Sequence, residues 1–440
     1  MNNNDQSRVT TSNAISRREA LKRTALAGAG FWIAGQSQRA RAASPNEKLN
    51  IACIGVGGRG HGNIKGLCDE NLVAFCDLDD VRAAKTYDLL PNVRRFRDFR
   101  KMFDVMENEI DAVVVSTPDH THFHPSMWAI ERGMHLYCEK PMAHNVWEIR
   151  RLTELAREKK VATQLGVQRH ALENVHRVVE LVRSKALGEL FEVYSWYNSG
   201  RGMPADAKTG ECVPSHLDWH LWLGPAKERA YSSSYCPYEW RFWWDFGTGE
   251  AGNWGCHILD IPFWALGLDH PTRVEASGPE VHPDKTPKSM VSKLQFAGND
   301  QRGPVTLHWS ARPPKILTEK KLDLRGTSVA FMGTEGILLC GFNCLRFLPE
   351  DKVMGHQPVE PTIAESPGFH QEWINAAKGA ATPPTCQFDY SGPLSEAVLL
   401  ANVAYRAGEG FDWDAQNLKT VGNPKAQSLI REEYRKGWDL

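Results

Sequence analysis

A glycine-rich segment after an apolar run has the spacing that binds dinucleotides. The run Lys48–Gly55 leads into a G-x-G-x-x-G motif, which reads Gly55-Val56-Gly57-Gly58-Arg59-Gly60. Gly55 permits the tight turn, Gly57 lets the backbone approach a pyrophosphate at the next helix, and Gly60 lets that helix pack closely. We expect Gly58 and Arg59 to contact the same cofactor. The alternative is a glycine-rich turn in an unrelated doubly wound fold.

An acidic residue stands where such a site needs one. Asp77 ends the second apolar run, Asn71–Asp77, about 20 residues after Gly55. Its carboxylate would accept hydrogen bonds from the ribose hydroxyls and would repel a 2′-phosphate. The sequence therefore favours NAD over NADP.

Histidines and a cysteine offer two competing chemistries. His120, His122 and His124 alternate along one segment and could bind zinc. No further cluster with ligand spacing is evident, so we predict no metal site. Cys256 stands beside His257, but no base and orienting partner for a thiol nucleophile can be identified.

Elements that would position these residues alternate in the first half of the chain. The apolar, strand-length runs are Lys48–Gly55, Asn71–Asp77, Asp111–Thr117, His135–Cys138 and Val161–Leu165. Helix-length stretches, such as Pro125–Arg132 and Asn145–Lys159, lie between them. This alternation predicts a doubly wound parallel sheet, covered on both faces, at residues 44–167.

The second half, residues 168–440, has a different pattern. A helix at Asn174–Ser184 precedes a series of strands with few helices between them, which predicts a mostly antiparallel sheet in an α+β domain. The expected strands are Leu190–Tyr197, Arg273–Ala276, Met290–Phe296, Pro304–Ser310, Lys321–Arg325 and Ser328–Phe331. A late helix, Pro393–Ala407, is followed by a polar tail.

Residues 1–43 have the layout of an export signal. Arg17 and Arg18 form a twin-arginine pair, a weakly apolar run Thr24–Ala34 follows, and Ala40-Arg41-Ala42 provides a small-x-small cleavage site. We therefore expect export to the periplasm by the twin-arginine route. This resemblance implies a pathway that exports proteins after they have folded. The alternative is an amphipathic helix, which its glycines would weaken.

Composition bounds the partners and the redox chemistry. The net charge of −1 gives no reason to expect nucleic acid, and no apolar stretch is long enough for a membrane anchor. Apolar content of 42% excludes a disordered chain. Cys340 and Cys344 could form a disulfide in an oxidising compartment, although their spacing matches no common framework. Whether they do stays open.

Several longer segments carry a family resemblance. They are STPDHTH, GMHLYCEKP with Glu139-Lys140-Pro141, the block GTGEAGNWGCHILD and the closing SEAVLLANVAYRAG. With the glycine loop, they make the chain similar to the glucose–fructose oxidoreductase and inositol dehydrogenase family (Gfo/Idh/MocA). The resemblance implies that residues 44–167 form an NAD-binding Rossmann domain and that a C-terminal domain follows, with an open sheet that often forms a dimer or tetramer interface. It also implies sugars, cyclitols or related polyols as substrates.

The resemblance assigns catalytic roles. Lys140 would stand beside the nicotinamide, where burial and the cationic ring lower its pKa and let it take a proton. The alternative is an exposed lysine that caps a strand. His257 would contact the reacting hydroxyl, although it could instead cap a core helix with Asp260. The family usually has an Asp four residues before this His; here Asn253 can orient a hydroxyl but cannot exchange a proton.

The resemblance also assigns contacts. Thr117, Pro118 and His122 would lie in the loop beneath the nicotinamide, and Glu139 would lie with Lys140 beside the cofactor. For substrate, aromatic faces suit the C–H faces of sugars, and a guanidinium can fork onto hydroxyls or a carboxylate. The predicted substrate contacts are Trp240, Arg241, Asn253 and His257.

These expectations combine into one leading function and two alternatives. The leading one is an exported NAD(H)-dependent oxidoreductase of a sugar, cyclitol or polyol that keeps its cofactor bound, because the periplasm offers little free NAD(H). The first alternative is a glycoside-cleaving enzyme that oxidises, eliminates and then reduces its substrate. A non-catalytic dinucleotide-binding protein is the third.

Overall fold

The computed structural model describes residues 47–198, 200–349 and 360–439. The predicted export signal lies outside these residues. None of the described helices is long and apolar enough to cross a membrane.

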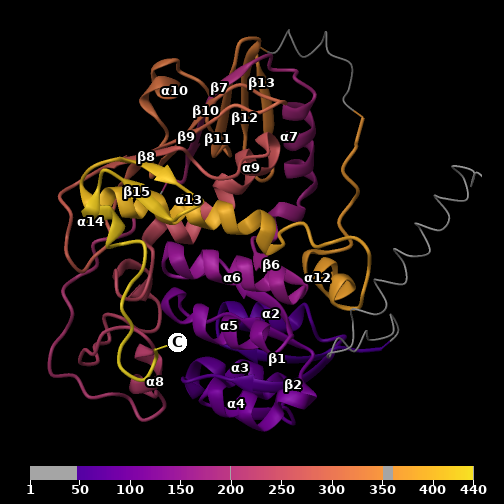
Figure 1. Cartoon of the computed structure of the whole chain (residues 1–440), viewed down its shortest axis with the longest axis vertical. Coiled ribbons are helices and arrows are strands. Elements are labelled where there is room, and N and C mark those ends of the chain that lie inside the picture. The colour runs from indigo at the N-terminus through magenta and orange to yellow at the C-terminus, as the bar shows by residue number, and fades with distance from the viewer. Residues whose placement is uncertain (1–46, 199, 350–359, 440) are drawn as a thin grey trace, which may run out of the picture. The chain divides into compact units, whose positions relative to one another are not determined.

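The first half forms a six-stranded parallel sheet in the order β3-β2-β1-β4-β5-β6 (Figure 1). Its strands are β1 (Asn50–Ile54), β2 (Asn71–Cys76), β3 (Arg94–Phe96), β4 (Ala112–Val115), β5 (His135–Glu139) and β6 (Thr163–Gly166). The helices of this half are α2 (Arg59–Lys65), α3 (Asp80–Leu89), α4 (Phe99–Met106), α5 (Phe123–Glu131) and α6 (Val146–Lys159). This order is that of a dinucleotide-binding Rossmann fold, and it confirms the predicted parallel sheet.

The apolar runs became strands because both faces of the sheet are covered. All four residues of β4 are buried, as are the last four of β1. The unpredicted strand β3 (Arg94–Phe96) lies at the sheet edge and is largely exposed, so it carries no apolar run. Helix α6 begins with a capping box in which the Asn145 side chain and Glu148 bind each other's backbone N–H groups.

The second half forms a nine-stranded sheet in the order β13-β12-β11-β7-β10-β9-β8-β14-β15. Only the β7–β10 pair is parallel, which confirms the mostly antiparallel prediction. The strands are β7 (Leu190–Trp196), β8 (Arg273–Ser277), β9 (Val291–Phe296), β10 (Val305–Ser310), β11 (Val329–Gly333), β12 (Gly336–Cys340), β13 (Leu345–Leu348), β14 (Phe411–Asp414) and β15 (Lys419–Val421). The helices are α7 (Glu173–Arg183), α8 (Trp219–Leu223), α9 (Cys256–Leu266), α10 (Lys315–Glu319), α12 (Phe369–Ala377), α13 (Phe388–Ala407) and α14 (Pro424–Gln427).

Three expectations in this half are wrong. Lys321–Arg325 is a turn and loop instead of a strand, and Lys321 has a positive φ of 54°. Helix α13 begins at Phe388, five residues before the predicted start, and includes Pro393 in its second turn. The predicted polar tail contains the strands β14 and β15, and β14 pairs with β8 at the edge of the sheet. These strands are short and alternate between buried and exposed residues, so the sequence shows no apolar run there.

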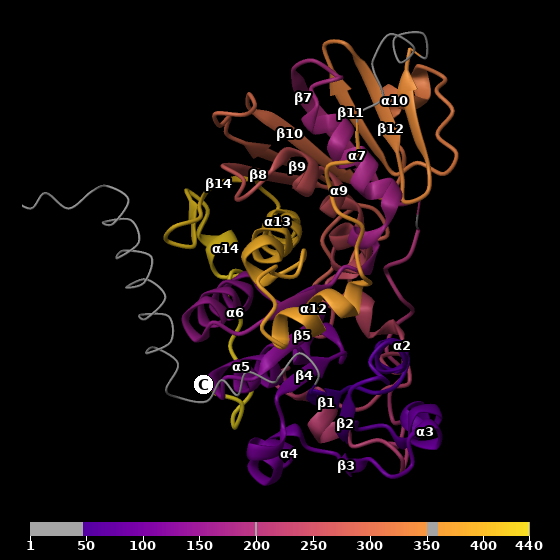
Figure 2. The same ribbon diagram turned by 90° about the vertical axis from the view of Figure 1, so that its right-hand side faces the viewer.

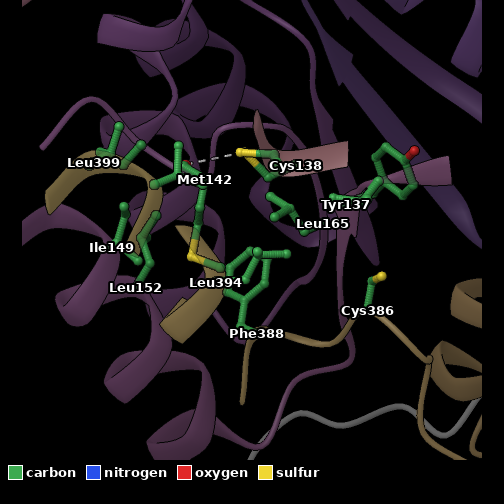
Figure 3. Close-up of a cluster of buried hydrophobic side chains, with 14 of the residues drawn as sticks. Tyr137, Cys138, Met142, Ile149, Leu152, Leu165, Cys386, Phe388, Leu394 and Leu399 are labelled. Carbon is green, nitrogen blue, oxygen red and sulfur yellow. Dashed lines mark hydrogen bonds between the residues drawn. The ribbon is translucent and has the colours of Figure 1, made fainter. Parts of the chain in front are cut away.

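Helix α13 joins the two sheets. It lies between them in both views (Figures 1 and 2) and packs against α6 of the first half and β8 of the second. Figure 3 shows Leu394 and Leu399 of α13 beside Ile149 and Leu152 of α6, with Met142 among them. The apolar core is therefore continuous from the parallel sheet to the second sheet.

A segment of the second half returns to the parallel sheet. We call residues 200–247 the strap. Its Asp218 N–H donates to the Leu78 carbonyl (3.1 Å), and the Asp80 N–H donates to the His216 carbonyl (3.3 Å). These bonds attach the strap to the loop after β2. A second apolar cluster packs the strap against Leu78. In this cluster the rings of Trp219 and Trp222 are stacked, with their centres 4.8 Å apart.

Candidate active site

A cavity of about 420 Å³ opens at the carboxyl ends of the parallel strands. It lies where the strand order reverses between β1 and β4, the place where such sheets bind ligands. The predicted residues that line it are Gly55, Gly57, Arg59, Asp77, Thr117, Pro118, Glu139, Lys140, Trp240, Arg241, Asn253 and His257. The predicted residues that do not line it are Gly58, Gly60 and His122.

The glycine loop connects β1 to α2 and presents bare backbone to the cavity. Gly60 lies behind it, where a Cβ would come within 1.9 Å of the Gly55 carbonyl oxygen, so only glycine fits. Gly58 is the N-cap of α2. The loop leaves Gly55 and Gly57 on the cavity wall, where N–H groups and the start of a helix suit a pyrophosphate.

Asp77 holds this loop. Its Oδ2 accepts hydrogen bonds from the N–H groups of Val56 (2.8 Å) and Gly57 (3.1 Å), and its Oδ1 accepts one from Asp79 (3.0 Å). Burial raises the pKa of the carboxyl, while these three hydrogen bonds act to lower it. The carboxylate thus positions the phosphate loop while it borders the cavity, a role that the sequence pattern did not indicate.

Glu139 collects three donors at one oxygen. Its Oε1 accepts hydrogen bonds from Arg59 (3.0 Å), Asn63 (3.0 Å) and Gln168 (2.7 Å). These donors come from α2 and from the turn after β6, so Glu139 ties the glycine loop to the start of the second half. Sequence reasoning missed Gln168, which lies in no recognisable motif.

Lys140 follows β5 and points at the block that precedes α9. Its Nζ donates hydrogen bonds to the Asn253 backbone carbonyl (2.8 Å) and to the Asn253 Oδ1 (3.2 Å). Burial lowers the pKa of Lys140, and the nearby Arg241 guanidinium lowers it further; Asp119, Cys256 and Glu139 act in the opposite direction without restoring it. A buried amine with a depressed pKa is suited to accept a proton.

A π-helical turn, Ala251–Gly255, carries Asn253 into the cavity. Such a turn interrupts the usual i→i−4 bonding and is common at functional sites. The Asn253 amide also donates to Glu250 Oε2 (3.3 Å), and Glu250 forms an ion pair with Arg201. An Asp at position 253 would face the Glu250 carboxylate, which gives a physical reason for the amide here.

His257 lies one turn further, at the start of α9. Its Nδ1 is buried without a hydrogen-bond partner among the described residues. Burial lowers its pKa well below 6.5, and the positive charges of Lys140, Arg169 and Arg59 add to this effect. The ring is therefore neutral near pH 7 and can donate or accept one hydrogen bond toward a ligand.

Asp260 faces away from this site, into the core. Its carboxylate accepts a hydrogen bond from the Tyr390 hydroxyl (2.6 Å) and lies 3.0 Å from the Nδ1 of His170, and only 1% of each of the His170 and Asp260 side chains is exposed. A ligand atom of Cys386 lies within 4.8 Å of these groups, a spacing that a metal could use. Burial, with the nearby Asp260 and Glu372 carboxylates, raises the pKa of the Cys386 thiol well above 9.0.

His122 joins two loops behind the cavity instead of bordering it. One ring nitrogen lies 2.7 Å from the Pro141 carbonyl oxygen and the other 2.8 Å from the Thr117 carbonyl oxygen. Asp119, which was not predicted, does line the cavity and accepts a hydrogen bond from the Thr248 hydroxyl (2.7 Å). The rings of His120 and His124 likewise approach backbone carbonyls, through both ring nitrogens of His120 and through Nε2 of His124.

Trp240 and Arg241 reach the cavity from the strap. The Arg241 guanidinium lies 4.3 Å from the centre of the Trp240 ring and 4.4 Å from that of Tyr238. One of its nitrogens, Nη1, donates to the Tyr238 carbonyl (3.1 Å). The guanidinium thus lies against two aromatic rings, and among the described residues the Tyr238 carbonyl is its only hydrogen-bond partner.

The residues fit a dinucleotide. The bare glycine loop supplies a phosphate cradle, and the buried Thr117 Oγ1 beside it has no partner among the described residues. Asp77 and Glu139 hold the two ends of that cradle in place.

Comparisons with known proteins agree with this geometry. Curated relatives include an inositol 2-dehydrogenase from Arthrobacter sp., 26% identical over 155 residues (34% of this chain, 45% of the relative), and a glycosyl hydrolase family 109 protein from Solibacter usitatus, 29% identical over 211 residues (42% and 46%). The matches thus span about half the length of these relatives. The solved WlbA dehydrogenase from Bordetella pertussis, in complex with NADH and UDP-GlcNAcA, is 18% identical with a TM-score of 0.59 (84% of this chain, 99% of that one), which shows a shared fold.

Two family models together cover more than half of the chain. The Gfo/Idh/MocA oxidoreductase family, NAD-binding Rossmann fold, matches residues 49–167, and its C-terminal alpha/beta domain matches residues 184–301. The chain therefore belongs to the Gfo/Idh/MocA oxidoreductase family.

Proposed function

We propose that the protein is an exported NAD(H)-dependent oxidoreductase that acts on a sugar, cyclitol or related polyol and keeps its cofactor bound. The observation that carries this proposal is the position of Lys140. Its buried Nζ shares one cavity with the bare glycine loop, 2.8 Å from the Asn253 carbonyl oxygen.

Each polar group then has a distinct task. NAD, when bound, supplies the hydride acceptor. Lys140 takes the hydroxyl proton, because its lowered pKa increases the neutral fraction of the amine near pH 7. Neutral His257 binds a neighbouring hydroxyl through its unpartnered nitrogen, and the Asn253 carbonyl and amide oxygen orient Lys140.

The strap supports cofactor retention. It is attached to the loop after β2, where the adenosine half of a dinucleotide lies in this fold, and its Trp222 and Trp240 line the cavity. A bound cofactor under this segment would leave only when the strap moves. Export by the twin-arginine route rests on Arg17 and Arg18 of the sequence and would carry such a loaded protein.

The experiment is to identify what the purified protein holds. Denaturing the protein should release NAD(H) in about one equivalent per chain, and neutral sugars, sugar acids and cyclitols should be screened for a change in nicotinamide absorbance. Release of NADP(H) would contradict the interpretation of Asp77. Absence of any dinucleotide would overturn the proposal of a resident cofactor.

A second candidate is redox-neutral cleavage of a glycoside. The observation in its favour is that two glycosyl hydrolase family 109 proteins match 42% and 40% of this chain. Oxidation of one carbon would acidify the neighbouring C–H, and loss of that proton would expel the leaving group and form a double bond. Water would then add across the double bond and return a hydrogen to that carbon, and reduction would restore the starting redox state of the cofactor. Incubation with a glycoside in heavy water should then place deuterium beside the oxidised carbon and leave the cofactor in its starting redox state. Simple dehydrogenation predicts no deuterium and a stoichiometric absorbance change.

A further inference from the structure

The charges on the cavity wall do not cancel one another. The acidic side chains there are already held by donors of the protein, as Asp77 and Glu139 show. Asp79 accepts from two N–H groups of α3, Asp98 pairs with Arg100, and Asp119 binds Thr248. Each of these carboxylates therefore already accepts hydrogen bonds from donors of the protein.

The basic side chains divide into two groups. Arg59 pairs with Glu139, and Arg97 pairs with Asp80. Among the described residues, Arg82, Arg169 and Arg241 have no ion pair with a carboxylate, although all three line the same cavity.

One of these guanidinium groups has a ready partner in the cofactor. A Cβ on Gly58 would lie 2.8 Å from an Arg82 Nη2, so Arg82 covers the glycine loop. The two negative charges of a pyrophosphate at this loop would be met by Arg82 and the backbone N–H groups. Arg169 and Arg241 remain after the cofactor is accounted for.

Both remaining guanidinium groups border the reaction centre. Arg169 lies over Phe342 (4.2 Å) and Trp254 (5.4 Å), and its charge lowers the pKa of His257. Arg241, which lies against two aromatic rings, lowers the pKa of Lys140. Burial lowers the pKa of Arg241 itself and outweighs the opposite effect of the Asp119 carboxylate, so water is partly excluded from this cation.

We propose that the substrate carries an oxyanion, a carboxylate or a phosphate, that Arg241 binds while Arg169 adds a second positive charge on the wall. This inference rests on the proposed function and narrows its substrate class to acidic sugars and polyols. A planar guanidinium held by ring stacking presents two parallel N–H donors, which match the two oxygens of a carboxylate or phosphate. A neutral sugar would leave these two half-buried cations without an ion-pair partner among the described residues, and only the Asp119 carboxylate would act on Arg241.

The test compares matched ligands that differ in the anionic group. The full chain with its bound dinucleotide is titrated calorimetrically with glucuronate against glucose, gluconate against glucitol, and glucose 6-phosphate against glucose. We expect the acidic member of at least one pair to bind about 10- to 100-fold more tightly, the range of charge-assisted hydrogen bonds. Preference in the first two pairs identifies a carboxylate, and preference in the third alone identifies a phosphate.

Variants connect that preference to Arg241. Arg241→Gln should abolish the preference for the acidic ligand while the protein still releases about one equivalent of dinucleotide. Arg157→Gln, at an exposed ion pair with Asp389, is the matched control and should keep it. Equal or weaker binding of every acidic ligand, or a preference that survives Arg241→Gln, would overturn the inference. Turnover of neutral polyols alone would overturn the inference of an acidic substrate and leave the proposed oxidoreductase activity standing. Preferential binding of an acidic ligand without any hydride transfer would support the anion site and overturn the proposed oxidoreductase activity.

Discussion

The two walls of the cavity differ in how their polar groups are satisfied. On the wall from the parallel sheet, Asp77 and Glu139 each accept three hydrogen bonds from the protein. On the wall from the second half, His257 Nδ1 has no partner among the described residues, and Arg241 makes one hydrogen bond, to a backbone carbonyl.

This difference separates structural from ligand-directed polar groups. A buried group that is fully paired fixes the shape of a loop, whereas an unpaired one loses solvation without compensation in the free protein. The wall from the parallel sheet is therefore pre-formed for a dinucleotide of fixed structure. The opposite wall keeps its donors and acceptors available for the reacting molecule.

The largest effect should follow removal of the one amine at the boundary between the walls. Lys140→Met removes the proton acceptor and its bonds to Asn253. Turnover should fall by about 10²–10⁴, the range for loss of an acid–base group, while the released dinucleotide remains near one equivalent. The readouts are kcat with the best substrate and the content of bound NAD. Unreduced turnover would transfer the proton role to another group.

Asp77 tests the wall that the protein satisfies internally. Asp77→Ser loses the hydrogen bonds to the glycine loop, so we expect NAD affinity to fall about 10- to 100-fold, given three charge-assisted bonds of modest net strength. Discrimination against NADP should relax as well. Asp77→Asn is the matched variant, because it keeps an acceptor oxygen without the charge. If Asn restores NAD affinity but not the discrimination, the hydrogen bonds and the charge have separate roles; unchanged NAD binding in Asp77→Ser would refute the assignment.

Position 253 tests how the walls communicate. In Asn253→Asp, a carboxylate would replace the amide oxygen that lies 3.2 Å from Lys140 Nζ. An adjacent negative charge stabilises the ammonium, so the pKa of Lys140 should rise and the pH–rate profile should shift upward by about one pH unit with activity retained at high pH. The new carboxylate would also face Glu250. The double variant Asn253→Asp/Glu250→Gln should therefore be more stable than Asn253→Asp alone and show the same shift of the pH–rate profile. A profile that does not move would separate Lys140 from the rate-controlling ionisation.

Short sequence patterns predicted those features of the fold and the site that depend only on residues close together in the chain. The glycine loop, the apolar strands and the strand-end Lys140 are each set by a few consecutive residues, so their types and spacing were sufficient. Gln168 and the strap could not be predicted, because their contacts join residues far apart in the chain, such as Gln168 and Glu139, that share no motif. Asp119 lies within the STPDHTH segment, but nothing in that segment indicates its contact with Thr248. The exposed edge strand β3 lacks an apolar run for the same kind of reason: its position, not its sequence, makes it a strand.

The smallest expected effect concerns a charge pair remote from the cavity, His144 and Glu432. Burial lowers the pKa of His144, but the Glu432 carboxylate outweighs this and raises it to about 9, while the pKa of Glu432 falls to about 2. A raised histidine pKa contributes stability that is full below the unfolded value of about 6.5 and is lost as the pH rises through 9. His144→Gln should therefore lower the free energy of unfolding by about 1–2 kcal/mol at pH 6, less than the full shift because Glu432 is partly exposed, and the difference should shrink by pH 9. Urea unfolding at both pH values measures it, and Arg157→Gln should show no such pH dependence. An equal loss of unfolding free energy at both pH values would mean that His144 stabilises the protein by packing and not by its charge. The His144–Glu432 pair would then differ from the charged groups that hold the wall formed by the parallel sheet.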